Sequence, residues 1–142
     1  MIAGEGPETD TWKHLERTFE ILDRVFFPGR ITGETKTAYY QHAAAVLMPS
    51  LEEACPIVAI EAITCGKTLL MSDIDAFSLF IGDNLPHRML PLIDLEAWKE
   101  AILKFPAVPN DNDRAAILKQ SEDYTIESVV RKHESLYKSI LA

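Results

Sequence analysis

Residues 45–71 read AVLMPSLEEACPIVAIEAITCGKTLLM. The stretch begins with a short apolar segment, Ala45–Met48, and ends with another, Thr68–Met71. Between them, Pro56 stands where a helix begins and Gly66 stands just past its end, which are the positions these two residue types favour. Two short apolar strands joined through a helix form a βαβ unit, whose strands run parallel and are buried on both faces. The stretch therefore predicts an α/β fold.

The same alternation of strands and helices continues on both sides of this unit. Because helices in such folds cover both faces of the parallel sheet, ligands bind at the carboxyl ends of the strands. Further strands are predicted at residues 1–3, 25–27 and 89–91, and helices at residues 9–22, 34–42, 77–81, 95–102, 113–118 and 126–140.

Length and charge exclude several classes of protein. The 142 residues suffice for one domain, and the formal net charge of −8 argues against nucleic acid or an anionic membrane surface as a partner. No apolar run approaches the length of a membrane span, and no secretory signal leads the chain. Cys55 and Cys65 are expected to be reduced, half-buried thiols of a cytosolic protein. The four histidines lack metal-ligand spacing and are expected at the surface or at helix ends.

The loop before the predicted helix at Pro56 is the first candidate site. Free backbone N–H groups and the positive end of a helix bind anions. Pro56 has no N–H, but Ile57 and Val58 are expected to keep theirs. Glu61 is the only polar residue in its apolar run, so it lies either on a narrow solvent stripe or buried against a partner. Glu53 precedes it by eight residues, and two carboxylates facing one cleft suit the hydroxyls of a sugar.

Other polar positions are weaker candidates. The stretch 4–7 (Gly-Glu-Gly-Pro) is better explained as a tight strand-to-helix turn than as a phosphate loop. Arg30 and Lys36 flank a second loop as isolated basic residues. Asp73 and Asp75 fit an Asx turn or a helix N-cap equally well.

Several of these segments, in this order and spacing, resemble the group 1 retaining glycosyltransferases (glycosyltransferase family 4), two-domain enzymes of the GT-B fold. The resemblance covers nearly the whole chain and matches the C-terminal, donor-binding half. It rests on residues 2–8, 24–29 and 48–50, on Glu53, on the pairs 61–62 and 65–66, and on the closing residues 124–126 and 136–137.

The resemblance implies roles for particular residues. Glu61 would bond the ribose hydroxyls of a nucleotide sugar, and Glu53 would contact the donor sugar as the catalytic carboxylate. The backbone of Pro56, Ile57 and Val58 would meet the diphosphate. The loop at Arg30 and Ile31 would border the base, with Lys36 nearby. Such enzymes typically need no metal ion and no cofactor beyond the donor.

The resulting expectation is a single Rossmann-like, nucleotide-sugar-binding domain over residues 1–142. It is the donor half of an enzyme that moves a hexose from a UDP- or GDP-sugar to a glycan or lipid-linked acceptor in the cytoplasm, including the inner face of the membrane. The N-terminal acceptor domain and a cationic clamp on the diphosphate are expected outside the chain, so we expect weak nucleotide binding without turnover. Ala54 replaces the usual glycine after the first glutamate, which bears on donor specificity.

Two alternatives remain from other classes. One is a non-catalytic nucleotide-sugar-binding or interaction module from a split or degenerate gene. The other is a flavodoxin-like domain, which would need an acidic pocket or flavin loop that is not apparent. An exposed sheet edge near Met1 and an apolar face of the C-terminal helix also predict self-association.

Overall fold

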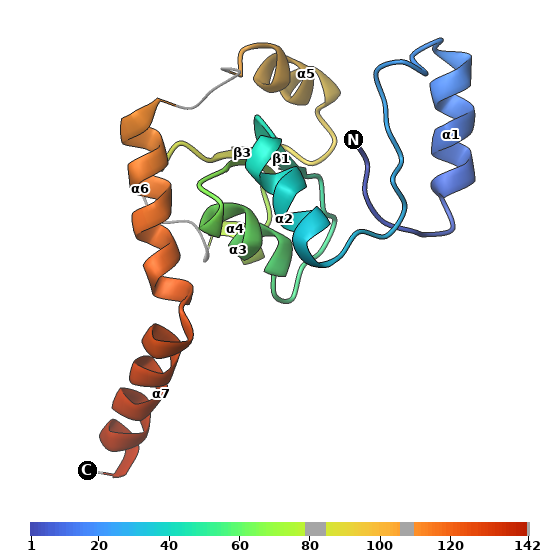
Figure 1. Cartoon of the computed structure of the whole chain (residues 1–142). Coiled ribbons are helices and arrows are strands. Elements are labelled where there is room, and N and C mark those ends of the chain that lie inside the picture. Colours follow the sequence, from blue (N-terminus) through green and yellow to red (C-terminus); the bar gives the residue numbers. More distant parts are fainter. Residues whose placement is uncertain (79–84, 106–109, 142) are drawn as a thin grey trace. The chain divides into compact units, whose positions relative to one another are not determined.

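A computed structural model describes residues 1–78, 85–105 and 110–141 of the chain (Figure 1). It divides the chain into two compact units, Met1–Tyr39 and Tyr40–Ala142, each described here by itself. The helices of the described residues are α1 (Thr9–Thr18), α2 (Gly33–His42), α3 (Ile57–Thr64), α4 (Asp75–Ser78), α5 (Leu95–Leu103), α6 (Asp111–Ser121) and α7 (Ile126–Leu141), with a 3-10 turn η1 (Glu122–Tyr124).

The second unit is built on a three-stranded parallel sheet. Its strands are β1 (Ala45–Met48), β2 (Thr68–Ser72) and β3 (Arg88–Leu90), in the order β1-β2-β3. Val46 pairs with Leu69, and Leu70 pairs with Arg88. Every residue of β2 is buried, as expected of a central parallel strand. The predicted α/β class is confirmed, and β3 begins one residue before the strand predicted at residues 89–91.

Helices cover both faces of this sheet. Leu69 and Met71 point to one face, where they join the larger apolar core with residues of α3, α4 and α6. Leu70 points to the opposite face and packs against Trp98 and Ala101 of α5. Since successive side chains of a strand alternate between faces, three consecutive apolar residues of β2 serve two separate cores.

Both strands predicted near the N-terminus are wrong. Residues 1–3 and 25–27 form no strand; a single parallel bridge joins Ala3 to Gly29. Two hydrogen bonds support it, from the amide of Ile2 to the carbonyl of Phe26 (2.8 Å) and from Gly4 to Gly29 (2.9 Å). Two short paired segments are only marginally stable by themselves, which is consistent with one bridge in place of regular pairing.

Two predicted helices also differ from the structure. Helix α1 ends at Thr18 instead of continuing to Leu22, because Glu20 takes a left-handed conformation with φ of 54°. Helix α4 spans Asp75–Ser78, so it begins two residues before the prediction. The remaining predicted residues, 79–81, lie outside the described part of the chain.

The turn between α3 and β2 needs a glycine. Gly66 has φ of +67°, and its amide bonds the carbonyl of Ile63 while the amide of Lys67 bonds that of Ala62. This pair of bonds is the Schellman motif, which closes a helix through a left-handed residue. A Cβ at Gly66 would also lie 3.3 Å from Cγ of Arg114 on α6. The turn therefore connects the end of α3 directly to the start of β2.

His87 corrects the expectation that all histidines lie at the surface or at helix ends. Its Nδ1 accepts the amide of Leu69 at 3.0 Å, and its Nε2 lies 3.1 Å from Oε1 of Gln120. The ring is half-buried, and burial lowers its pKa below the ordinary value of 6.5, partly offset by the bond to Gln120. The imidazole is therefore held neutral, accepting with Nδ1 and donating with Nε2.

We expect acid to destabilise the chain through His87. Above pH 6.5 both states carry a neutral ring, but below it the unfolded state binds a proton more readily than the folded one. Stability is therefore lost as the pH falls from about 6.5 through the lowered pKa of the folded state. His87→Ala should cost about 1–3 kcal/mol at pH 7, because the buried amide of Leu69 loses its acceptor. It should also flatten the loss between pH 7 and pH 5.

Urea unfolding of both chains across this pH range checks the prediction. His14→Ala is the matched control, because His14 is exposed on α1 and should keep the acid sensitivity of the parent chain. A parent chain equally stable at pH 7 and pH 5 would contradict the assignment.

Candidate functional site

The candidate site begins in the loop that follows β1. Glu53 lies half-buried in this loop, and Oγ of Ser50 donates to its Oε1 at 2.9 Å. Ser50 comes two residues after the end of β1, so the loop holds the carboxylate near the carboxyl end of the strand. This is the edge at which α/β proteins bind ligands.

The N-terminus of α3 lies just beyond this carboxylate. Pro56 is the N-cap, and no side chain of the described residues caps the helix. The amides of Ala59 and Ile60 both bond the carbonyl of Pro56, at 2.9 and 3.2 Å. The amide of Ile57 donates to the carbonyl of Cys55 at 2.9 Å. This contradicts the expectation that the N–H of Ile57 is free to bind an anion.

The amide of Val58 differs from those of Ile57 and Ala59, which both donate to backbone carbonyls. Within the described ranges no acceptor is recorded for its amide, and the residue is exposed. An uncapped helix start with an unsatisfied N–H is the combination that attracts an anion, because the partial charge of the helix end adds to the donor.

Glu61 lies in the second turn of α3 and has a partner. Oη of Tyr40, from the last turn of α2, donates to Oε2 of Glu61 at 3.0 Å. Both residues are half-buried. Burial, followed by the bond to Glu61 and its negative charge, raises the pKa of Tyr40. Of the two alternatives from the sequence, the structure favours a carboxylate held against a partner over one on a solvent stripe.

The remaining predicted contacts belong to the first unit. Arg30 is exposed, Ile31 is half-buried, and Lys36 is half-buried in the first turn of α2. Glu53, the start of α3 and Glu61 belong to the second unit, whereas Arg30, Ile31 and Lys36 belong to the first.

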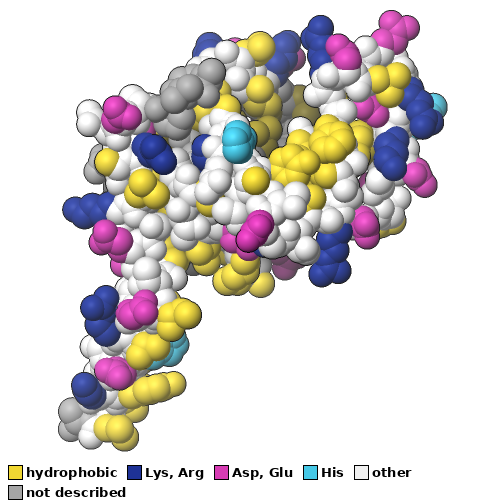
Figure 2. Space-filling view, viewed as in Figure 1, with side chains coloured by type: hydrophobic (Ala, Val, Ile, Leu, Met, Phe, Trp, Pro, Cys, Tyr) yellow, Lys and Arg dark blue, Asp and Glu magenta, His cyan; other side chains and the backbone are white. Residues whose placement is uncertain are grey.

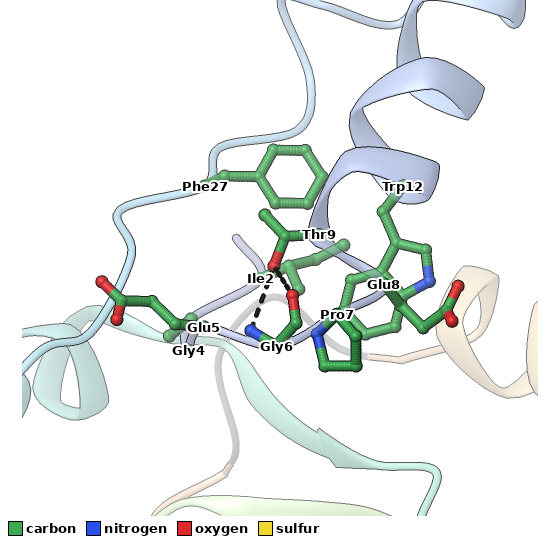
Figure 3. Close-up of a pocket in the computed structure, with 10 residues that line it drawn as sticks. Ile2, Gly4, Glu5, Gly6, Pro7, Glu8, Thr9, Trp12 and Phe27 are labelled. Carbon is green, nitrogen blue, oxygen red and sulfur yellow. Dashed lines mark hydrogen bonds between the residues drawn. The ribbon is translucent and has the colours of Figure 1, made fainter.

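A pocket of about 290 Å³ in the first unit was not anticipated from the sequence (Figure 3). The loop of residues 4–7 forms part of its wall, with Trp12 and Phe27 on either side of Thr9. The hydroxyl of Thr9 closes the loop, because it accepts the amide of Gly6 at 3.2 Å and donates to its carbonyl at 2.8 Å. The loop is therefore a tight turn into α1, as predicted, but it also lines a cavity.

The surface carries two further features. Figure 2 shows hydrophobic side chains along one side of α7, and Ile126, Ile140 and Leu141 are among its most exposed apolar residues. Cys55 is exposed, unlike the prediction, whereas Cys65 is half-buried; both are free thiols. Among the described residues no helix is long and apolar enough to span a bilayer, and no group of three or more metal-ligating side chains occurs.

The sheet is parallel and covered on both faces, and the uncapped start of α3 follows the carboxyl end of β1, the edge at which α/β proteins bind ligands. The family model described as "Glycosyl transferases group 1" matches residues 1–122, and the chain belongs to this family.

Two curated relatives support the assignment. The chain is 30% identical over 105 residues to the alpha-galactosylglucosyldiacylglycerol synthase of Streptococcus pneumoniae, covering 73% of this chain and 27% of the relative. It is 27% identical over 104 residues to the phosphatidyl-myo-inositol mannosyltransferase of Mycolicibacterium smegmatis, covering 72% and 26%. The chain therefore spans about a quarter of the length of these relatives.

Solved structures share the fold. TarM matches with a TM-score of 0.76 at 23% identity, over 96% of this chain and 28% of that one. The pneumococcal O-GlcNAc transferase GtfA, solved with UDP and GlcNAc, matches with a TM-score of 0.71 at 17% identity, over 99% and 29%. These matches confirm that the chain has the fold of part of a GT-B glycosyltransferase.

Proposed function

We propose that the chain is the donor-binding domain of a retaining glycosyltransferase that takes a hexose from a UDP- or GDP-sugar. The observation that carries the proposal is the open start of α3 between two held carboxylates. Glu53 lies in the loop before the helix, the amide of Val58 lies in its first turn, and Glu61 lies in its second. Membership of the family supports a nucleotide sugar as the ligand.

Each part of the site has a chemical task in this proposal. The amide of Val58 and the helix end stabilise the negative charge that grows on the leaving diphosphate as the anomeric C–O bond breaks. Glu61 accepts hydrogen bonds from the ribose hydroxyls, and Glu53 contacts the donor sugar. The acceptor hydroxyl oxygen bonds the anomeric carbon as the nucleoside diphosphate leaves, and its proton passes to the leaving diphosphate. Arg30, Ile31 and Lys36 border the base, and no metal ion or cofactor takes part.

The acceptor and the setting are part of the same proposal. Two relatives carry lipid names, a diacylglycerol glycolipid synthase and a phosphatidylinositol mannosyltransferase, which supports a glycan or lipid-linked acceptor. We place the enzyme in the cytoplasm. All 142 residues then belong to one donor-binding domain, and the acceptor is bound by the rest of the enzyme.

Calorimetric titration of UDP- and GDP-sugars into the chain tests the proposal. We expect one of the two nucleotides to bind, and Glu61→Ala to weaken that binding about tenfold or more, since a charge-assisted bond between a carboxylate and a hydroxyl is worth about 1.5–3 kcal/mol.

The matched control is Glu127→Ala, which removes an exposed glutamate of α7 outside the site and should leave affinity unchanged. An unchanged affinity in Glu61→Ala would reject the role of Glu61, and a chain that binds neither nucleotide sugar would reject the proposed function.

A further inference from the structure

The Tyr40–Glu61 pair joins two helices at the site. Its 3.0 Å bond joins side chains 21 residues apart, from α2 and α3. A phenol that donates to a carboxylate makes a charge-assisted bond, which is stronger than a bond between neutral groups. Burial and the charge of Glu61 raise the pKa of Tyr40, so its hydroxyl remains a donor throughout the physiological pH range.

Packing holds the tyrosine ring as well as its hydroxyl. Tyr40 is half-buried against the larger apolar core, whose members include Ala59 and Ile63 on the same helix as Glu61. A ring with two side-chain torsions that is packed on one side loses little further freedom when its hydroxyl bonds a neighbour. Tyr40 is therefore a rigid donor aimed at one oxygen of the carboxylate.

We propose that Tyr40 is a positioning residue, which holds Oε2 of Glu61 so that the carboxylate is oriented for the ribose hydroxyls of the nucleotide sugar. The inference rests on the proposed function, because it needs Glu61 to contact ribose. Each carboxylate oxygen has two lone pairs, so the bond from Tyr40 uses one of the four accepting positions of Glu61 and leaves its charge in place to attract a sugar hydroxyl. Fixing the carboxylate before the ligand arrives reduces the entropy lost on binding.

Removing only the hydroxyl tests this role. Calorimetry compares the binding of UDP and GDP with that of their 2′,3′-dideoxy analogues, in the full 142-residue chain and in Tyr40→Phe. The parent chain should prefer the ribose form by about tenfold. Tyr40→Phe should reduce this preference to about threefold and leave the affinity for the dideoxy analogue unchanged, since that ligand offers no hydroxyl to Glu61.

The neighbouring tyrosine provides the matched control. Tyr39→Phe removes a hydroxyl from the same helix, from a half-buried residue for which no bond to Glu61 is recorded, and it should keep the full preference. In a Glu61→Ala background, Tyr40→Phe should have no further effect, because the two residues act through one contact. Circular dichroism melts of each variant confirm that the fold is retained.

The outcomes separate the two proposals. If Tyr40→Phe keeps the full ribose preference, or weakens both ligands equally, the positioning role is overturned while nucleotide binding stands. If the parent chain binds nucleotide without preferring ribose, Glu61 does not read the ribose and the positioning role is overturned with it. If the parent chain binds no nucleotide, the proposed function itself is overturned.

Discussion

Phe77→Ala should destabilise the chain by about 3–5 kcal/mol, the range for deleting a buried aromatic ring. Phe77 is completely buried in the larger core, against residues that include Ile63 of α3 and Met71 of β2. Helix α4 has only four residues, too few to be stable by itself. The ring is the only buried residue of α4, so its removal leaves a cavity behind the strand and helix that carry the site.

Urea unfolding followed by circular dichroism measures this loss. Phe77→Leu keeps much of the volume and should cost clearly less than the alanine variant. Phe19→Ala is the exposed counterpart, because Phe19 is 66% exposed and its removal should change stability by no more than about 0.5 kcal/mol. Similar losses for Phe77→Ala and Phe19→Ala would contradict the core described here.

Trp98→Ala should produce a loss of similar size from the opposite face of the sheet, again about 3–5 kcal/mol. Trp98 is 8% exposed, packs against Leu70 of β2, and donates from Nε1 to the carbonyl of Pro91 at 3.0 Å. Among the described residues the smaller core has two other buried members, Leu70 and Ala101, and Trp98 is the largest of the three. Removing the indole therefore leaves a cavity in the smaller core.

Trp98→Phe separates packing from hydrogen bonding in the same unfolding measurement. The phenylalanine variant keeps most of the apolar contact but leaves the carbonyl of Pro91 without its donor, so it should cost about 1–2 kcal/mol. Trp12→Ala is the control, because Trp12 is 45% exposed and its loss should be the smallest of the three. If Trp98→Ala costs no more than Trp12→Ala, α5 does not cover the second face as described.

The central part of the fold was predictable from local pattern. The apolar runs that became β1 and β2, and the Pro56 and Gly66 that flank α3, all lie within 27 residues. The burial of the strands, the ends of the helix and the parallel arrangement all follow from residues close together in the sequence. The two failed strands, at residues 1–3 and 25–27, show the limit of the same reasoning. An apolar run becomes a strand only where a neighbour pairs along its length, and here one bridge forms instead.

The candidate site was predictable in position but not in its contacts. A strand end followed by a helix start predicted where an anion would be attracted. The bond from the Ile57 amide to Cys55, which leaves Val58 as the open donor, depends on backbone angles at the N-cap that no motif specifies. The role of His87 as an acceptor for Leu69 was missed for the same reason, since the two residues are 18 positions apart.

The sequence by itself determined the α/β class, the order of the central elements, the family resemblance and the pair of glutamates eight residues apart. Apolar periodicity and the residues that begin and end helices act over short stretches of chain, so these features can be seen without the tertiary structure. Only the tertiary structure decided that Glu61 is held by Tyr40, that His87 completes the central strand and that the loop of residues 4–7 lines a cavity. Each of these joins residues that folding alone brings together, and a half-buried polar group takes whichever partner the packed elements place beside it.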